Sequence, residues 1–480
     1  WGQIPVIDPV SSAIIGIVTR TDLLKNLQRL QPKKNINGNY AEKIEKALSP
    51  GRLALIKKVI EKANDHNLPI YTVGGFVRDL VLDRPSHDLD IVIEGDAIKI
   101  ANELAQSLGG RVVCHRRFGT AKWQINGTRK ELASKLKITP EQAEDLPDFL
   151  DLISARTEFY EHPTAMPTVE NSSIKLDLHR RDFTINTLAI RLDRKHYGEL
   201  IDHWGGLEDL RKKKIRVLHS LSFVDDPTRM LRAVRFEQRF DFQIEERTLQ
   251  LIEEARPMLR QVSGDRLRHE FDLVFREENP ARIMKRLQEL HLLHAIDENL
   301  IWEIDQSSAF VKLKTSQPDS YWSLPGAVGN VPVEIALHWL VWFGSLAPSC
   351  VSDLSRRFKF PSQLTAALKS TSDILEGLNS LHDTKPSIVS TMLDGVPPVS
   401  LYAAYLLTSK NESKELVCTY VKKWKNVRIS VSGNDLRQAG ILPGPEYKRI
   451  LTSLRSAYLD GVIISPKEER DLLQQLIKQD

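Results

Sequence analysis

Residues 71–93 (YTVGGFVRDLVLDRPSHDLDIVI) constrain the fold of this chain more than any other segment. A short apolar strand at 71–73 runs directly into Gly74 and Gly75, and a helix follows. Glycine lets a backbone turn sharply and approach a ligand closely, and the start of a helix favours negative charge. We therefore expect Gly74 and Gly75, with Arg78 on that helix, to cradle a triphosphate.

The same segment ends with two acidic residues, Asp88 and Asp90, at the start of an apolar run. Residues i and i+2 of a strand point to the same side, so the two carboxylates are expected to converge. Like charges held together are costly unless a cation lies between them, and hard oxygen ligands suit Mg²⁺ when phosphates complete its shell. We predict two magnesium ions at this pair. Asp151, at the start of a later strand, is a candidate third carboxylate or a surface acid, and Asp79 is expected to orient Arg78.

Three later segments carry clustered charges in a fixed order: residues 178–186 (LHRRDFTIN), 225–236 (DDPTRMLRAVRF) and 262–270 (VSGDRLRHE). Together with the first segment they resemble the motifs of polymerase-beta-like nucleotidyltransferases. In detail, they resemble those of class II tRNA nucleotidyltransferases and bacterial poly(A) polymerases. Thr187 stands where that family usually has Ala, and Asp225 where Glu is more usual.

The resemblance implies an α+β fold: a polymerase-beta-like nucleotidyltransferase head, with a mixed sheet and helices, followed by an all-helical neck, body and tail. Residues 4–28 also resemble the last half of a CBS domain, in which a G-I-V-T segment leads into a helix. The expected divisions are a partial CBS domain at 1–30, a linker at 31–50, the head at 51–205, a helical neck with the nucleobase-selecting motif at 206–300, a helical body at 301–425 and a helical, tRNA-binding tail at 426–480.

Two segments of the head do not continue its pattern of apolar strands. Residues 127–149 are polar and helix-prone, and they interrupt the sheet where the family often has only a hairpin. Residues 159–175 show no clear period, and we expect a mobile loop beside the site.

The resemblance also implies the reaction: an RNA 3′-hydroxyl attacks the α-phosphate of ATP or CTP and pyrophosphate leaves. Such transfer needs in-line positioning and neutralised charge more than covalent help. Arg156 is expected to contact the primer or the mobile loop. The remaining residues expected to bind triphosphate or sugar are Arg181, Asp182, Asn186, Arg232 and Arg235.

Asp226 and Arg229 lie three residues apart on one face of a helical turn. An aspartate accepts from the exocyclic amine of cytosine or adenine, and an arginine donates to the adjacent ring nitrogen. Uracil and guanine have the opposite polarity and leave buried groups unpaired, at about 1–3 kcal/mol per group. Within this motif we interpret the pair as selecting the nucleobase, although an ordinary helix salt bridge would have the same spacing.

Composition sets further bounds. With 480 residues, 41% of them hydrophobic and 27% charged, the chain is long enough for several globular domains. A net charge of +4 means that any nucleic-acid surface is local. Three widely spaced cysteines and no apolar run of membrane-spanning length fit a cytoplasmic protein. The first residue is Trp1 rather than Met, so we expect the sequence to be a fragment.

The sequence therefore predicts an enzyme that builds or repairs the 3′-terminal CCA of tRNA, with the acceptor and T arms held by the helical half. The CBS resemblance and Asp225 favour an enzyme that adds only A, and a complete CBS pair upstream would bind an adenine nucleotide. One alternative is a bacterial poly(A) polymerase, although residues 470–480 do not form the basic tail common there. The other is a non-catalytic, CBS-regulated protein that binds RNA or nucleotides.

Overall fold

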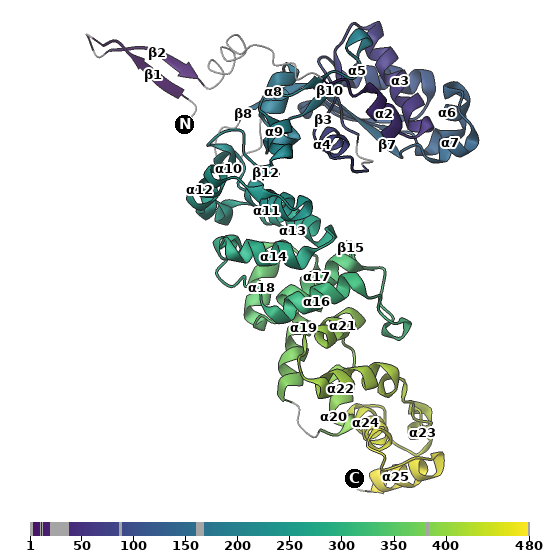
Figure 1. Ribbon diagram of the computed structural model, residues 1–480. Coiled ribbons are helices and arrows are strands. Elements are labelled where there is room, and N and C mark those ends of the chain that lie inside the picture. The colour runs from purple at the N-terminus through teal and green to yellow at the C-terminus, as the bar shows by residue number, and fades with distance from the viewer. Residues whose placement is uncertain are drawn as a thin grey trace. The chain divides into compact units, whose positions relative to one another are not determined.

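The computed structural model divides the chain into two compact units, Trp1–Ala255 and Arg256–Asp480 (Figure 1). Each unit is described by itself. Asp88, one of the two predicted metal ligands, lies outside the described residues. The structure describes residues 3–9, 11, 13–19, 38–85, 89–159, 168–380 and 384–478.

The N-terminal segment forms an antiparallel hairpin of β1 (Gln3–Ile7) and β2 (Ile14–Thr19). The helix expected after the G-I-V-T segment lies outside the described residues. Ile4 and Ile15 are 58% and 64% exposed, so this hairpin buries little of its apolar surface. Its assignment to a CBS domain stays a prediction.

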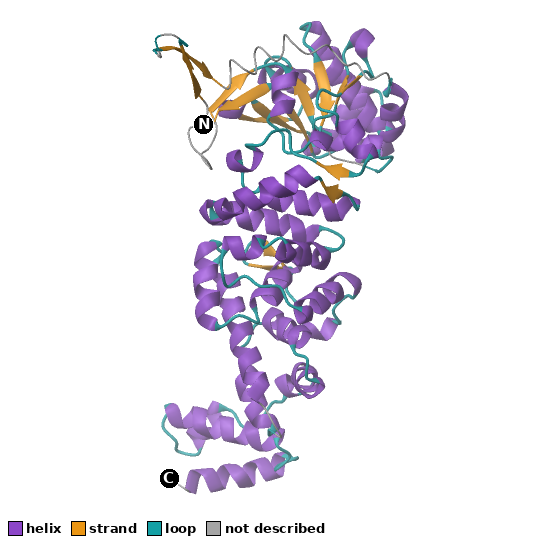
Figure 2. Cartoon of the chain, turned by 60° about the vertical axis from the view of Figure 1, so that its left-hand side comes forward, coloured by secondary structure: helices purple, strands orange, loops and turns teal. Residues whose placement is uncertain are grey.

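A seven-stranded sheet forms the centre of the first unit, in the order β11-β10-β3-β4-β7-β6-β5. Strand β4 pairs with β7 in parallel, and every other neighbouring pair is antiparallel, which confirms the expected mixed sheet (Figure 2, orange strands). The strands are β3 (Ile70–Val73), β4 (Ile91–Ile93), β5 (Arg111–His115), β6 (Thr120–Gln124), β7 (Phe149–Ser154), β10 (Ala189–Arg191) and β11 (Leu200–Ile201).

The two halves of this sheet are buried differently. Every residue of β3 and β4 is buried. On one face of these strands, α8 (Ile174–His179) packs against Tyr71, Val73 and Val92. Helix α5 (Ala97–Leu108), whose apolar positions recur with helical spacing, packs on β5, β6 and β7. In β6 and β7 buried and half-exposed residues alternate, so only one face of that half is covered.

The insertion between β6 and β7 is helical, as its composition predicted. A turn η2 (Asn126–Thr128) leads into α6 (Arg129–Leu136) and α7 (Pro140–Glu144). Helix α7 begins with a capping box between Thr139 and Gln142. Helix α6 packs against α5 and against α3 (Pro50–Asp65), so the insertion extends the helical layer on the covered face of the sheet.

The loop expected at 159–175 is wrong in part. Strands β8 (Arg156–Phe159) and β9 (Thr168–Asn171) pair antiparallel, and residues 160–167 between them lie outside the described residues. The segment predicted as a linker contains a helix, α2. The remaining elements of this unit are α2 (Ala41–Ala47), α4 (Gly75–Val81), η1 (Arg116–Phe118), η3 (Thr184–Asn186), η4 (Arg194–His196), α9 (Gly206–Arg211), β12 (Lys214–Ile215), α10 (Ser222–Asp225), α11 (Arg229–Phe240), β13 (Gln243–Ile244) and α12 (Glu246–Ala255).

The second unit is helical apart from one short strand pair, β14 (Ala327–Val328) with β15 (Val331–Pro332). The apolar sequence of residues 333–343 forms the buried helix α17 (Val333–Phe343). Within the described residues, no helix has the length and apolar character needed to span a bilayer. The other elements are η5 (Arg256–Gln261), α13 (Gly264–Arg276), α14 (Pro280–Glu289), α15 (Leu292–Ile296), α16 (Ile304–Thr315), η6 (Ser320–Trp322), α18 (Pro348–Arg357), α19 (Ser362–Ser380), α20 (Pro386–Leu393), α21 (Pro398–Leu407), α22 (Asn411–Lys422), η7 (Trp424–Asn426), α23 (Gly433–Gln438), α24 (Pro445–Leu459) and α25 (Pro466–Lys478).

Candidate active site

The glycine turn between β3 and α4 lies against an arginine of the second motif. Gly74 has φ 69° and ψ −125°, a conformation that side chains with a Cβ rarely adopt. A Cβ placed there would lie 2.5 Å from Nη1 of Arg181. The turn therefore requires glycine for both conformation and space, and it brings two of the predicted triphosphate residues together. Gly75 is less constrained, because its Cβ would lie 3.6 Å from Nη2 of Arg78.

Arg78 is the start of a buried polar network. Asp79 binds its guanidinium through both carboxylate oxygens, at 2.8 and 3.0 Å, as expected from the sequence. Nη1 of Arg78 donates to Oδ1 of Asn186 at 2.7 Å. The guanidinium also lies 5.4 and 4.6 Å from the ring centres of Phe236 and Phe240. These contacts fix Arg78 and connect α4, η3 and α11.

Asp182 continues the network. Its Oδ1 accepts from Nδ2 of Asn186 at 2.8 Å, and its Oδ2 accepts from Nε and Nη2 of Arg232 at 2.9 and 2.7 Å. Burial alone would raise the pKa of Asp182, but the Arg232 cation and these hydrogen bonds outweigh it and hold the pKa far below its usual range. Asp182 is therefore ionised throughout the physiological pH range, and it fixes Arg232 beside Asn186.

Asp177 was missed in the sequence, although its i+3 and i+4 spacing to two arginines is a signal for it. The side chain is fully buried, and it accepts from Arg180 at 2.9 Å and from Arg181 at 3.4 Å. Its Oδ1 also accepts from the backbone N–H of Arg156. Burial opposes ionisation, but the two arginines lower the pKa of Asp177 below its ordinary value. Asp177 thus positions Arg181 against the glycine turn, while the Arg156 guanidinium donates to the carbonyl of Phe118.

The predicted nucleobase-selecting residues are held at the start of α11. Oδ1 of Asp226 accepts from the backbone N–H and the hydroxyl of Thr228, at 3.0 and 2.7 Å. Nη1 of Arg229 donates to Oγ of Ser222 at 2.8 Å, and Nη2 donates to the carbonyl of Arg180 at 2.7 Å. This second contact joins the motif to the arginine pair before Asp182. Ser222 could not be identified from the sequence.

Arg235 lies on α11, nearly two helical turns beyond Arg229. It is buried, 6% exposed, with its guanidinium 5.2 Å from the ring centre of Phe236. Arg232 is by contrast 30% exposed in its side chain. Of these two arginines, Arg232 is therefore the more accessible to a ligand.

The described carboxylates of the predicted metal site lie on neighbouring strands. Ile91 of β4 pairs in parallel with Leu152 of β7, so Asp90, just before β4, and Asp151, the third residue of β7, lie side by side. Both line a pocket of about 240 Å³. Lys122 of β6 places Nζ 3.9 Å from Oδ1 of Asp151.

This donor set fits a hard divalent cation, because it offers two carboxylates to one pocket. Among the described residues no group of three His, Cys, Asp or Glu side chains forms a metal site, and Asp88 lies outside them. That Asp88 supplies a further oxygen ligand stays a prediction from the sequence.

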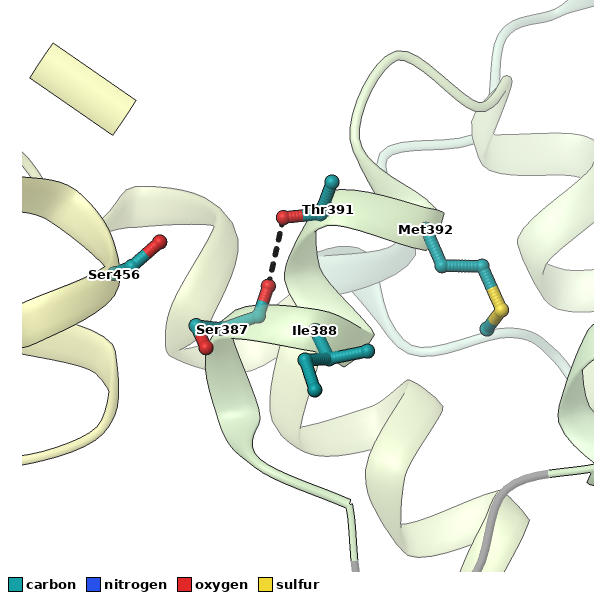
Figure 3. A pocket seen from close by; sticks show the side chains of 5 residues that line it. All are labelled: Ser387, Ile388, Thr391, Met392 and Ser456. Carbon is teal, nitrogen blue, oxygen red and sulfur yellow. Dashed lines mark hydrogen bonds between the residues drawn. The ribbon is translucent and has the colours of Figure 1, made fainter. Parts of the chain in front are cut away.

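A second pocket of about 430 Å³ lies in the other unit, between α20 and α24 (Figure 3). Figure 3 shows Thr391 donating to the carbonyl of Ser387, at 2.8 Å. Its lining consists of hydroxyl and apolar side chains with no charged group, namely Ser387, Ile388, Thr391, Met392 and Ser456. It therefore lacks the groups that neutralise a triphosphate, and the head is the candidate active site.

Comparison with known proteins agrees with this geometry. A family model described as the poly A polymerase head domain matches residues 70–216, and one described as the probable RNA and SrmB-binding site of polymerase A matches residues 241–300. An A-adding tRNA nucleotidyltransferase of Halalkalibacterium halodurans is 33% identical over 91% of this chain and 94% of its own length. The chain belongs to the tRNA nucleotidyltransferase family.

Two further members of the family extend the comparison. The A-adding tRNA nucleotidyltransferase of Geobacter sulfurreducens is 32% identical over 98% of this chain, but the chain spans only 54% of that protein's length. The solved structure of the Thermotoga maritima CCA-adding enzyme complexed with tRNA has a TM-score of 0.69 and 29% identity, covering 92% of this chain and 98% of that one. The predicted family and the α+β fold with a helical second half are therefore confirmed.

Proposed function

We propose that this tRNA nucleotidyltransferase adds the terminal adenosine to the 3′ end of tRNA that already ends in CC. One observation carries the proposal: the A-adding relatives from Geobacter and Halalkalibacterium each match more than nine tenths of the chain. Addition of the whole CCA is the second candidate, favoured by the similarity to the Thermotoga CCA-adding enzyme.

The proposed reaction joins RNA to ATP in one displacement. The 3′-hydroxyl oxygen of the tRNA attacks the α-phosphorus, a new O3′–P bond forms, the bond to the oxygen bridging to the β-phosphate breaks, and pyrophosphate leaves. The hydroxyl proton passes to a carboxylate oxygen of Asp90 or Asp151, or to water. Gly74, Arg181 and Arg232 are proposed to supply the hydrogen-bond donors and positive charge that a triphosphate needs.

Asp88 and Asp90, with Asp151 beside them, are the residues proposed to hold magnesium. Magnesium bound there supplies charge neutralisation to the phosphates and the attacking oxygen. The chain's own contribution is to keep two carboxylates adjacent through the β4–β7 register.

Asp226 and Arg229 are proposed to read the adenine. Thr228 fixes Asp226, and Ser222 and the carbonyl of Arg180 fix Arg229. The base would therefore contact side chains that are already held in place. Such a site rejects uracil and guanine because the buried groups would be left unpaired.

The proposed partners are ATP and the acceptor and T arms of tRNA, with the second unit as the RNA-binding half. CTP is a further substrate only if the whole CCA is added. We propose a cytoplasmic location, because the three cysteines are free thiols, as a reducing compartment would keep them. An adenine nucleotide at a complete CBS pair stays a prediction.

The test is incorporation of labelled ATP and CTP, each alone and together, into tRNA ending in the discriminator base, in C and in CC. The proposal expects ATP incorporation into the CC-ending tRNA alone. Ordered CTP and ATP incorporation on the shorter tRNAs would establish full CCA addition instead. Long A tails on unrelated RNA would establish a poly(A) polymerase, and no incorporation at all would leave only a binding protein.

A further inference from the structure

The sheet of the head has an open half-face beside the carboxylates. In β6 and β7, the side chains of Ala121, Trp123, Leu150 and Leu152 are all at least 95% buried, and α5 packs on these strands. The residues between them alternate to the opposite face and are half-exposed or exposed. On that opposite face α8 packs on β3 and β4, and Ile153 of β7 packs against the same cluster, while the remaining outward-facing residues of β5, β6 and β7 are half-exposed or exposed.

The strand register orders the side chains of this open face into rows. Arg111 of β5, Gln124 of β6 and Phe149 of β7 are opposite one another in the first row. Lys122 and Asp151 are opposite one another in the second row, which continues to Asp90 on β4. A strand rises about 3.3–3.4 Å per residue, and residues two apart point to the same face. The first row is therefore about 7 Å along the strands from the row that holds the proposed catalytic carboxylates.

The chemistry of these rows is that of a nucleic-acid surface. Phe149 is 43% exposed, and Nζ of Lys122 lies 3.8 Å from its ring centre. Arg111 is exposed at the end of the same row as Phe149, and Arg116 and Arg117 are exposed in the turn that follows β5. Exposed aromatic rings stack on bases, and neighbouring cations meet the phosphates of a single strand.

We propose that this open face seats the 3′-terminal nucleotides of the tRNA as they enter the site. Phe149 stacks on a base, and Arg111 contacts a backbone phosphate. Lys122 lies between Phe149 and Asp151 and contacts both. The inference rests on the proposed function, because it names where the RNA substrate of that reaction lies. A phosphate-rich strand complements the cations of the face, whereas the acids there, Asp90 and Asp151, are the ones that receive its 3′ end.

The experiment measures steady-state AMP incorporation into CC-ending tRNA by the full chain and three variants. Phe149→Leu and Arg111→Gln change the face. Lys135→Gln is the matched control, because it removes one exposed cation from α6, which packs on the covered side of the sheet. Thermal melting confirms that each variant folds.

Phe149→Leu is expected to raise the KM for tRNA at least about fivefold, with the KM for ATP unchanged. Arg111→Gln is expected to lower the slope of log affinity against log salt by about 0.7–0.9, the loss of one phosphate contact. The control is expected to match the wild type.

The inference would be overturned if both face variants kept the wild-type KM for tRNA and the wild-type salt slope. The same result would be found if this face bound a different macromolecule instead of tRNA. That result differs from failure of the proposed function, in which the wild type itself would incorporate no AMP.

Discussion

The two units of this chain bury different kinds of side chain. In the first unit a connected set of charged and polar groups is buried: Arg78 with Asp79, Asn186 and Asp182. In the second unit the core around α17 is aromatic, with ring centres 4.7–6.4 Å apart. Its members include Trp302, Phe271, Phe275, Phe310, Trp339, Trp342, Phe343, Phe358 and Phe360.

This difference shows where the chain performs chemistry and where it provides support. A buried charge network costs desolvation, so it is kept where oriented charges are needed. An aromatic core is stabilised by burial and ring packing, and it needs few oriented polar partners. Variants in the first unit should therefore lose activity per folded molecule, and variants in the second should lose stability.

The largest expected effect is on the aromatic core. Trp339 is fully buried, and its indole N–H donates to Asp272 at 2.8 Å. Trp339→Ala is expected to destabilise the second unit by about 3–5 kcal/mol, because a large cavity forms and Asp272 loses its donor. Denaturant unfolding followed by tryptophan fluorescence measures this. A loss below about 1 kcal/mol would contradict the packing described, because few substitutions in a close-packed core cost so little.

The proposed catalytic carboxylate gives the next effect. Asp90→Asn removes one charge and keeps the shape, so folding should be unchanged while the rate of AMP incorporation falls by about 10²–10³-fold. Single-turnover assays with saturating tRNA and ATP measure the rate. Asp148→Asn, in the same pocket but paired with Arg129, is a matched control and should retain activity.

Acid should distinguish the two units, because protonation of His338 would lower the stability of the second unit. It is buried among Phe275 and Phe310, its Nδ1–H donates to the carbonyl of Glu334, and Lys314 lies near it. Burial, opposed only in part by that hydrogen bond, lowers the pKa of His338 to about 4 from an ordinary 6.5.

The sign of the effect follows from proton binding. Above pH 6.5 His338 is neutral in both the folded and the unfolded chain. Between pH 6.5 and pH 4 His338 binds a proton in the unfolded chain but not in the folded chain. Stability of the second unit should therefore fall by about 3 kcal/mol between pH 6.5 and pH 4. His338→Phe should remove this part of the slope in urea titrations at each pH. An unchanged slope in the variant would show that other groups cause the loss.

The smallest expected effect is on base selection. Arg229→Lys keeps the charge but loses the planar set of donors fixed by Ser222 and Arg180. Discrimination between ATP and UTP should fall by about 1–3 kcal/mol, measured as the ratio of kcat/KM values. Arg239→Lys, an exposed arginine at the end of the same helix, should leave that ratio unchanged. Equal losses for both nucleotides in Arg229→Lys would show a structural role only.

Local patterns predicted much of this architecture. The strand, glycine turn and helix of residues 71–81, the helical insertion and the buried helix α17 follow from periodicity and glycine chemistry within short windows. The contacts that complete the site could not be predicted in this way. Arg78 and Asn186 are 108 residues apart, and Arg232 and Asp182 are 50 apart, so only the fold brings them together.

Two side chains beside the site illustrate the same limit. Lys122 is an ordinary alternating residue in its own strand, and its position next to Asp151 depends on the β6–β7 register. Asp177 lies three and four residues before Arg180 and Arg181, a spacing that predicts helical ion pairs, but its complete burial does not follow from the sequence. The role of a charged residue here depends on which strand or helix its neighbour belongs to.

The most direct test measures activity per folded molecule in two variants, Asp182→Asn and Trp339→Leu. Each is assayed for AMP incorporation into CC-ending tRNA and, in the same buffer, for its folded fraction. The account predicts that Asp182→Asn loses activity well beyond any loss of folded protein, because Arg232 and Asn186 lose their common partner. Trp339→Leu should lose stability but keep its activity per folded molecule. The reverse result, with Asp182→Asn fully active and Trp339→Leu inactive while folded, would contradict the account.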